Sequence, residues 1–555
     1  MITLSLLSFF SVVFSDIWSQ LYLNPLDEEL NFTLLLKQKN THILEQELID
    51  RSDPYSKNYA KWLTNTEINT IIQPDDYTPV IKSLQVNNIS YTDYIDNIKC
   101  EGTVKNIQNF FQTTIHGNTA SLPPALSPHI DMVLGSSDHY NRPQFSPEST
   151  PYKDGDMSIS PESLARLYNI SYPKPKSVSS QSVAEFLGDS CYNNDDLQTF
   201  LNASNIPNIS ISKEHFWGSC SPTTSDPDIE ATLDIQYQTG VNPYTELYYI
   251  SVSDWLYQFA NKVYSSESPP KVISISYGWA EWDQCDTAVF PTCLLNTTAE
   301  DYTVRTNVEF IKLGLRGITL VASSGDAGAP GRTDEECDQD NMLNPAFPAS
   351  SPWVLAVGGT IITKPVELEN PKTPLCQTNT CIGGGVELNC NFDRCGWTSG
   401  GGFSNFFYRP AWQAIASRNY LKSGATFPPN KYFNSSGRVY PDISLVAHNY
   451  LIKGPGGYMH VDGTSASGPS VSGMVSILNN LRVSNGKSTL GPVAPLLYSL
   501  VDHCPTCFND IVVGSNNSTE ESSCKWGYQA TKGFDAVYGL GTPNFKAIYS
   551  YVAQL

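Results

Sequence analysis

Charged side chains are scarce in this chain, and basic ones are the scarcer kind. Charged residues make up 16% of the 555 positions, and Lys and Arg total 34 against 55 Asp and Glu, which gives a net charge of -21. This negative excess argues against nucleic acid or an anionic membrane as a partner. It suits an acidic compartment, because an acidic surface loses its self-repulsion as the pH falls.

Long apolar runs are also missing. Residues 1–15 are apolar but too short to span a bilayer, and no later run is long enough, so we expect a secretory signal peptide and no membrane span. Sequons for N-glycosylation agree with the secretory route. Nine are present, at Asn31, Asn88, Asn169, Asn202, Asn208, Asn296, Asn434, Asn516 and Asn517.

Cysteine is nearly absent from the first 154 residues. Cys100 is the only one there, and the other twelve of the 13 lie further along the chain. An even number of cysteines in a secreted chain indicates disulfides. The pair Cys504-Pro-Thr-Cys507 taken alone also suits a zinc site, but in an oxidising compartment we favour a disulfide.

The N-terminal part has its own pattern. Apolar residues follow helical spacing at 43–49 and 103–111, and a strand-like run occurs at 31–36. We therefore predict a compact α+β domain over residues 16–154. Its end, residues 142–157, is rich in Pro and charged residues and is predicted to be an exposed linker.

From residue 155 onward, buried-strand patterns alternate with helical ones. The strand-like runs are 180–187, 247–252, 272–278 and 317–325, and residues 307–315 have helical spacing. The alternation predicts an α/β domain with a parallel sheet covered by helices. Functional loops gather at the carboxyl ends of such strands. Asp326, in the turn after the last strand, is therefore a candidate site residue.

Ser465 lies in the segment 462–470, Asp-Gly-Thr-Ser-Ala-Ser-Gly-Pro-Ser, which leads into a helical pattern at 471–478. We expect this serine at the start of a buried helix, whose free N–H groups and dipole favour negative charge beside it. A serine there can be a nucleophile if another residue takes its proton. It can equally be an ordinary N-cap, and the segment alone does not decide between them.

A histidine base for this serine is not evident. The chain has eight histidines, and the only His-Gly pair, His116-Gly117, lies in the N-terminal part. Subtilisin-type peptidases share Gly-Thr-Ser before a helix and use a histidine from a His-Gly-Thr motif. We therefore predict that Ser465 is not served by histidine.

Two carboxylates provide an alternative base. Asp226 is predicted to cap a helix with Pro227 in its first turn. Glu230 and Asp234 then lie four residues apart on one face, about 6 Å along the axis. Carboxylates so close perturb each other's pKa, so that one holds a proton while the other accepts one. A solvated acidic face is the alternative, but an apolar stripe lies alongside: Ile229, Leu233 and Tyr237.

These motifs together resemble the sedolisin, or serine-carboxyl peptidase, family, and in particular its tripeptidyl-peptidases. The order Glu230-x-x-x-Asp234, Ser324-Gly325-Asp326 and Gly463-Thr464-Ser465 carries the resemblance. It extends over nearly the whole chain, through the segments 52–59, 347–352, 357–360, 399–405, 440–442 and 539–545. The fold it implies is a subtilisin-like parallel sheet with flanking helices, preceded by an α+β propeptide.

The resemblance also implies roles for the candidate residues. Ser465 would attack the peptide carbonyl, and Glu230, oriented by Asp234, would take and return its proton. Asp326, kept protonated, would donate a hydrogen bond to the oxyanion, which favours acid pH. Substrate backbone would pair with the strand that holds Ser274, Ser276, Tyr277 and Gly278.

A structural calcium site is implied as well. Hard oxygen ligands beside tight turns suit Ca²⁺, although two surface aspartates in turns are the plain alternative. The ligands implied are the carboxylates of Asp510 and Asp535 and the carbonyls of Ile511, Thr531 and Gly533. The cysteines depart from the family pattern, since Cys337 is displaced and the segment 376–395 adds four, so disulfide pairing stays open.

The sequence thus predicts a signal peptide at 1–15, an inhibitory propeptide at 16–154 and a catalytic domain at 155–555. The expected activity is release of tripeptides from free N-termini of peptides or unfolded proteins, after autocatalytic removal of the propeptide at acid pH. The alternatives are an acid endopeptidase and a catalytically inactive calcium-binding glycoprotein. We expect the protein in a lysosome or similar acidic compartment, or secreted.

Overall fold

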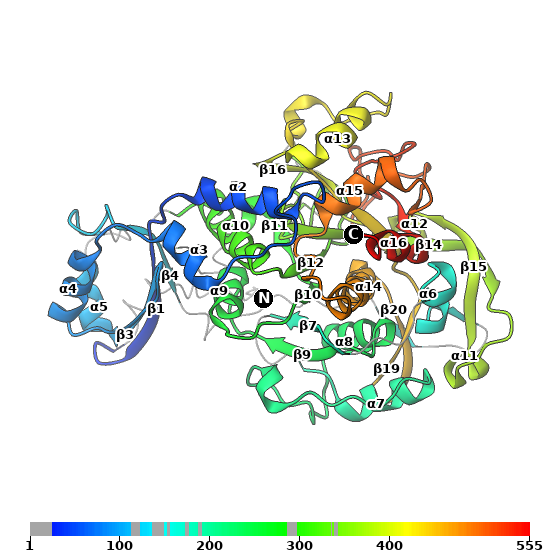
Figure 1. Ribbon diagram of the computed structural model, residues 1–555, viewed down its shortest axis with the longest axis horizontal. Helices are drawn as coiled ribbons and strands as arrows, with labels where there is room; N and C mark the ends of the chain where they lie inside the picture. Colours follow the sequence, from blue (N-terminus) through cyan, green and yellow to red (C-terminus); the bar gives the residue numbers. More distant parts are fainter. Residues whose placement is uncertain are drawn as a thin grey trace, which may run out of the picture. The chain divides into compact units, whose positions relative to one another are not determined.

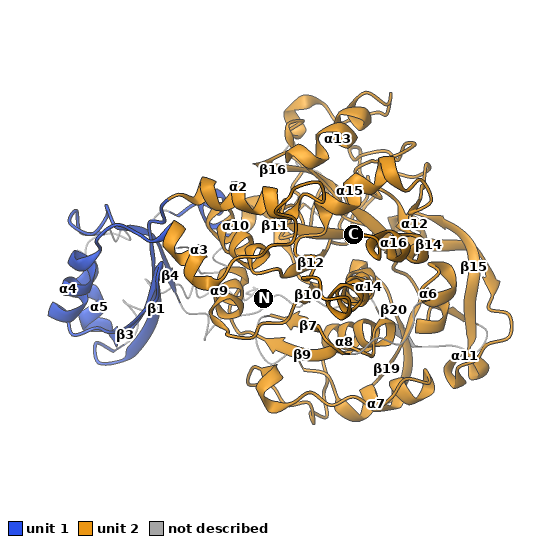
Figure 2. Ribbon diagram, viewed as in Figure 1, with its two compact units in different colours: residues 1–39, 72–143, 285–302 blue, residues 40–71, 144–284, 303–555 orange. Residues whose placement is uncertain are grey.

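Apolar residues alternate along β1 (Glu29–Leu36), which lies within the sheet of the first of two structural units (Figures 1 and 2). This unit comprises residues 1–39, 72–143 and 285–302. Its sheet is antiparallel, with spatial order β2 (Ser90–Asp93), β3 (Asn97–Thr103), β1 and β4 (Ile130–Gly135). The helices α4 (Thr78–Val86) and α5 (Val104–Phe111) share one apolar core with this sheet, as the α+β pattern predicted.

The computed structural model describes residues 25–112, 122–135, 149–151, 156–171, 177–186, 191–285, 293, 297–334, 336–337 and 342–555. The expected signal peptide and the sequon at Asn296 lie outside these residues. Within them, no helix combines the length and apolarity that a membrane crossing requires.

The second unit, residues 40–71, 144–284 and 303–555, is built on a nine-stranded and mostly parallel sheet. Its strands, in order, are β6 (Met157–Ser158), β15 (Thr380–Leu388), β14 (Val354–Glu367), β12 (Thr319–Ser323), β10 (Val272–Ile275), β7 (Ser180–Glu185), β9 (Glu246–Ser251) and β8 (Phe216–Trp217), and β18 (Ile443–Val446) also pairs with β14. Only the β14–β15 pair is antiparallel among these. Such sheets are buried on both faces, which explains the continuous apolar runs in the sequence.

Helices surround this sheet (Figure 1). They are α2 (Thr41–Ser52), α3 (Asn65–Ile72), α6 (Pro161–Leu167), α7 (Asn194–Ala203), α8 (Ile229–Val241), α9 (Leu256–Ser265), α10 (Ala299–Leu315), α11 (Pro374–Thr378), α12 (Phe392–Cys395), α13 (Ala414–Leu421), α14 (Thr464–Ser484), α15 (Ala494–His503) and α16 (Phe545–Val552). Almost every residue of α8 and α14 is buried. This burial places both helices in the core although they carry polar residues, and α14 packs on α8 and on the strands β10, β12 and β14.

Short strands complete the second unit. They form the pairs β11 (Trp279–Ala280) with β13 (Ala346–Phe347), β16 (Gly402–Tyr408) with β17 (Gly437–Tyr440), β21 (Phe508–Asn509) with β22 (Thr542–Pro543), and the three-stranded sheet β19 (Tyr450–Gly454), β20 (Gly457–Val461), β5 (Ser149–Pro151). The strand β5 lies inside the predicted linker, so that segment is partly ordered against β20.

Candidate active site

Ser465 is the second residue of α14. It lines the cleft and does not cap the helix. The cap position is Gly463, whose φ of 114° is left-handed, and no side chain caps this helix. An added Cβ at Gly463 would lie 3.1 Å from Asp326 Oδ2, so glycine is required there. The Ser465 hydroxyl points toward the carbonyl of Ser276, at 3.5 Å. The N-cap alternative is therefore wrong.

Asp326 is held against the start of the same helix. It follows β12 by three residues, and its Oδ1 accepts hydrogen bonds from the backbone N–H and the hydroxyl of Thr464, at 2.6 and 2.8 Å. These contacts occupy one carboxyl oxygen. Oδ2 then carries the proton whenever the group is neutral.

Glu230 and Asp234 lie on α8, which begins later than the sequence suggested. The helix starts at Ile229 and is capped by Asp228, whose side chain accepts from the Ala231 N–H at 3.1 Å. The predicted cap at Asp226 with Pro227 in the first turn is wrong, because Asp228 lies at the correct distance to satisfy the first-turn N–H groups. Both carboxyl groups are nevertheless buried, with 1% and 0% exposure, so the solvated-face alternative is wrong as well.

Ser276 connects α8 to the nucleophile. Its hydroxyl donates to Asp234 Oδ1 at 2.8 Å, and its carbonyl accepts from Ser465. The strand β10 ends at Ile275, so residues 276–278 lie beyond the regular strand that the sequence predicted. Ser276, Tyr277 and Gly278 line the cleft, whereas Ser274 is fully buried within β10.

Glu185 was not identified from the sequence. It is the last residue of β7, next to β10 in the sheet, and it is fully buried while accepting a hydrogen bond from the Tyr277 hydroxyl at 3.0 Å. The available signal was an acidic residue inside the apolar run Val183-Ala184-Glu185-Phe186. Carboxyl ends of neighbouring parallel strands meet at one edge of a sheet, which brings Glu185, Ser276 and Asp326 together.

Burial shapes the charge of these acids. It raises the pKa of Glu230 well above its usual range, the charge of Glu185 adds to this, and hydrogen bonding by Ser465 opposes it. Burial, then Glu185 and Glu230, likewise raises the pKa of Asp234, against the hydrogen bond from Ser276. Burial also raises the pKa of Glu185 to about 8 and that of Asp326 above its usual range. In acid, most of these groups hold protons.

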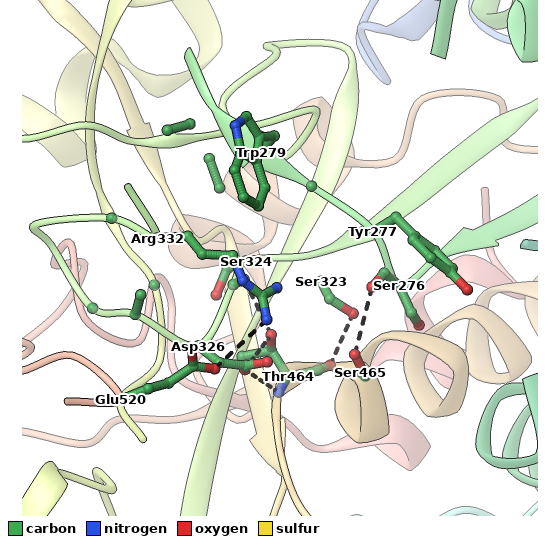
Figure 3. Close-up of a pocket in the computed structure, with 18 of the residues that line it drawn as sticks. Ser276, Tyr277, Trp279, Ser323, Ser324, Asp326, Arg332, Thr464, Ser465 and Glu520 are labelled. Carbon is green, nitrogen blue, oxygen red and sulfur yellow. Dashed lines mark hydrogen bonds and ion pairs between the residues drawn. The ribbon is translucent and has the colours of Figure 1, made fainter. Parts of the chain in front are cut away.

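Several of these residues line one cleft with about 660 Å³ of empty space (Figure 3), whereas Asp234 and Glu185 lie buried behind it. Its lining contains Glu230, Asp326, Thr464 and Ser465, and no histidine is among the described residues that line it. The structure thus places a hydroxyl group beside carboxyl groups with raised pKa at the edge of a parallel sheet.

Comparison with known proteins adds to this picture. Residues 18–139 match the family described as Pro-kumamolisin, activation domain, and residues 226–490 match the subtilase family. Physarolisin of Physarum polycephalum is 37% identical over 544 residues, which cover 94% of this chain and 93% of the relative. Tripeptidyl-peptidase 1 of Mus musculus is 30% identical over 576 residues, covering 94% and 91%. The chain belongs to the sedolisin family.

This sedolisin also shares its fold with a solved member. Pseudomonas sedolisin, a serine-carboxyl proteinase complexed with pseudo-iodotyrostatin, superposes with a TM-score of 0.54 at 22% identity, over 72% of this chain and 98% of that one. The protein is therefore a peptidase with a subtilisin-like domain and an N-terminal activation domain. The inactive glycoprotein considered from the sequence is set aside.

The cysteines of this sedolisin form disulfides, as predicted. The pairs are Cys191–Cys220, Cys285–Cys293, Cys337–Cys524, Cys376–Cys381, Cys390–Cys395 and Cys504–Cys507, and Cys100 is free and buried. The bond between Cys504 and Cys507 rules out zinc at that pair.

The residues expected to bind calcium come together in two adjacent loops. Asp510 Oδ2 accepts from the Gly533 N–H at 2.8 Å, and Asp535 Oδ2 accepts from the Thr531 N–H at 2.9 Å. Burial raises the pKa of Asp535, and hydrogen bonds from backbone N–H groups oppose this. The negative charge of Asp510 raises the pKa further. The buried Thr531 hydroxyl has no hydrogen-bond partner. Paired carboxylates with unused oxygen donors fit a hard cation.

One sequon serves a structural purpose. The Asn516 side chain is fully buried, and its amide donates to the carbonyls of Gly401 and Ala536, at 3.0 and 3.2 Å. A glycan on this nitrogen is incompatible with the folded chain. The sequence pattern alone does not distinguish such a residue from an exposed acceptor.

Proposed function

We propose that this sedolisin is an acid serine peptidase that uses Ser465, Glu230, Asp234 and Asp326 and releases tripeptides from free N-termini once its propeptide is removed. The observation that carries the mechanism is the cleft in which Ser465 lies among buried carboxyl groups, with no histidine among the lining residues that the structure describes. The tripeptidyl specificity draws on the similarity to tripeptidyl-peptidase 1.

The proposed reaction begins when Glu230 takes the proton of Ser465 as the hydroxyl attacks the carbonyl carbon. Asp234 and Glu185, kept neutral by burial, allow Glu230 to carry the single negative charge of the group. The protonated Asp326 donates to the oxyanion together with the Ser465 N–H at the start of α14. Glu230 then protonates the leaving amine, and water releases the acyl group by the same steps in reverse.

The test of the mechanism uses zymogen matured by added wild-type peptidase that is afterwards removed. We expect Ser465→Ala and Glu230→Gln to abolish cleavage of a fluorogenic peptide at acid pH while the fold, followed by circular dichroism, is retained. A variant with near-normal cleavage removes its residue from the mechanism.

The test of specificity compares a peptide with a free N-terminus and its N-acetylated counterpart. A tripeptidyl-peptidase needs the free amine, so blocking it should eliminate tripeptide release, detected by mass spectrometry. Internal cleavage of both peptides at equal rates instead supports the acid endopeptidase, the second candidate.

We further propose that Asp510, Asp535 and the carbonyls of Ile511, Thr531 and Gly533 hold one structural Ca²⁺. The ion would neutralise the paired carboxylates and fasten the two loops. Chelation should lower the melting temperature of the Ser465→Ala protein, and added Ca²⁺ should restore it. An unchanged melting temperature contradicts the site.

The signal-like segment 1–15 and the acidic composition support a lysosomal or other acidic endomembrane location, with secretion as the alternative.

A further inference from the structure

Asp462, the residue before the N-cap of α14, is fixed to a loop from an earlier part of the second unit. Its Oδ2 lies 2.7 Å from Nδ1 of His448, and its Oδ1 accepts from the Asn449 N–H at 2.7 Å. The next N–H along the chain, that of Gly463, donates to the Ala447 carbonyl at 3.0 Å. His448 and Asp462 are called here the clamp pair, because these contacts hold the backbone from which α14 begins.

The clamp pair lies at the same edge of the sheet as the candidate catalytic groups. His448 follows the end of β18 by two residues, and Asp326 follows the end of β12 by three. Both strands run parallel to β14, so their carboxyl ends meet at one edge. The side chains of His448 and Asp462 are 27% and 16% exposed, and neither is among the described residues that line the cleft. Any effect of the pair on the reaction is therefore indirect.

The clamp pair is connected to Asp326 by the chain and by its charges. Thr464, two residues after Asp462, donates its backbone N–H and hydroxyl to Asp326 Oδ1, at 2.6 and 2.8 Å (Figure 3). Burial raises the pKa of Asp326, and the hydrogen bonds from Thr464 lower it. The charge of Arg332 lowers this pKa as well, whereas the charge of Asp462 raises it. Histidine is protonated in acid, so His448 places a positive charge beside Asp462 and offsets its effect.

We propose that His448 and Asp462 are positioning residues whose opposite charges together set the pH above which the peptidase loses activity. The proposal rests on the proposed function of Asp326 as oxyanion donor, since Asp326 donates only while it is protonated. A negative charge on Asp462 disfavours ionisation of Asp326 and keeps its proton to higher pH, whereas a positive charge on His448 favours loss of that proton. The intact pair therefore holds the upper limit of activity at an intermediate pH.

The test follows kcat against pH for the matured enzyme with one fluorogenic peptide. Asp462→Asn should move the alkaline limb to lower pH by about half a pH unit, and His448→Gln should move it to higher pH by a similar amount. The double variant lacks both charges, so its alkaline limb should return to the wild-type position. The pH of a limb does not depend on the folded fraction. A clamp that is only structural lowers kcat at every pH without moving the limb, and that result overturns the proposal.

Other ionisable groups face the clamp pair or Asp326, and they are the same in every variant. They are Asp156, Glu230, Arg332 and His460. His460 is buried on β20, and burial lowers its pKa, as does the charge of His448, against the charges of Asp156 and Asp462. Loss of the Asp462 charge would lower the pKa of His460 and loss of the His448 charge would raise it. Both changes oppose the shifts expected for the alkaline limb, so His460 cannot produce them.

His215→Gln is the matched control. His215 also lies beside a carboxylate, that of Glu246 at 3.8 Å, and it is not among the described residues that line the cleft, so neither limb should move. Asp326→Asn distinguishes failure of the clamp from failure of the oxyanion donor. An alkaline limb at the wild-type pH in Asp326→Asn contradicts the proposed role of Asp326. If Asp326→Asn moves the limb, but Asp462→Asn and His448→Gln leave it in place or move it in the same direction, the clamp proposal alone is overturned.

Discussion

The two carboxyl oxygens of Asp326 have different hydrogen-bonding roles. The protonation state of Asp326 should therefore be visible in the activity of the enzyme. Oδ1 is fixed by Thr464, so donation to an oxyanion must come from a proton on Oδ2. We predict that Asp326→Ala lowers kcat by about 10²–10³ at pH values below the pKa of Asp326, as expected for the loss of one oxyanion donor.

Asp326→Asn gives the sharper result. Its amide donates without a titrating proton, so the alkaline limb of the kcat profile should move to higher pH than in the wild-type enzyme. Wild-type activity should disappear as the pH rises through the pKa of Asp326, because the ionised group cannot donate. An alkaline limb at the same pH in both proteins contradicts the assigned role.

Glu185 gives a second prediction for the pH profile. Burial raises its pKa to about 8, so Glu185 is neutral in acid, and the charge that would otherwise raise the pKa of Glu230 is absent there. Glu185→Gln keeps an acceptor for the Tyr277 hydroxyl and imitates the neutral acid. The acid limb of kcat/KM should therefore stay where it is in the wild-type enzyme, as steady-state assays between about pH 2 and 6 would show, and an acid limb moved to lower pH would mean that Glu185 is ionised there. Glu267→Gln, an exposed glutamate, is the matched control.

The candidate catalytic residues could be proposed from sequence because each lies in a short motif whose chemistry suits the proposed role. Glu185 could not, because its position depends on the register of β7 beside β10, which brings the ends of distant strands together. The role of the Ser276 side chain was hidden for the same reason. Its spacing is that of any strand residue until α8 is placed beside it.

At the scale of elements, the segment 40–71 is assigned to the propeptide by sequence and yet belongs to the second unit. The Trp62 ring nitrogen donates to the Thr489 carbonyl at 2.8 Å, and the Leu63 N–H donates to the Leu315 carbonyl at 2.8 Å. The guanidinium of Arg482 lies over the Tyr59 ring, at 5.3 Å. None of these contacts involves the junction near residue 154, so all of them survive cleavage there.

We predict that Trp62→Ala weakens the hold of the cleaved propeptide on the catalytic domain by at least about tenfold, because tryptophan side chains contribute strongly to such contacts and the partly buried Trp62 also donates a hydrogen bond across this one. Zymogen is processed at acid pH, and co-elution of the two fragments is measured by size-exclusion chromatography. Ile43→Ala, which truncates a 37% exposed residue of α2, should co-elute as the wild-type protein does. Equal retention of both variant propeptides contradicts an anchor at Trp62.

Element boundaries show what sequence patterns miss. The run 317–325 was predicted as a strand and forms one only at Thr319–Ser323, and the helix predicted at 307–315 begins at Ala299. Apolar spacing locates the buried part of an element. Its ends are set by caps and by packing with distant residues.

At the scale of the whole molecule, buried carboxyl groups make stability depend on pH. Burial raises the pKa of Glu281 to about 7, although Ser404 and the Asn405 N–H donate to it. An acid with a higher pKa in the folded chain binds its proton more tightly there. Its contribution is fully present below about pH 4.5 and is lost as the pH rises to about 7, by about 1.4 kcal/mol per pH unit.

We therefore predict that the free energy of unfolding of the Ser465→Ala protein decreases between pH 4.5 and 7, measured by urea denaturation. Glu281→Gln should reduce this slope, whereas Glu267→Gln, at an exposed position, should not. A slope that is unchanged in Glu281→Gln means that Glu281 titrates equally in the folded and unfolded chains.

The parallel sheet and the α+β first unit could be predicted because buried strands and helices have different apolar periods. The antiparallel β15 and the disulfide pairs could not, because contacts between distant segments leave no local pattern. Cys337 and Cys524, for example, are 187 residues apart.

The short strand β5 has a consequence for maturation. It pairs with β20, and β20 ends four residues before Ser465. A cut at the predicted boundary after residue 154 places β5 on the propeptide side of the break. When the propeptide departs, the edge of β20 loses its partner, and its outward amides become open to solvent. The mature enzyme would then have an unpaired strand edge at β20, close in sequence to Ser465. Faster hydrogen exchange of the β20 backbone amides would report the release of the propeptide without an activity assay.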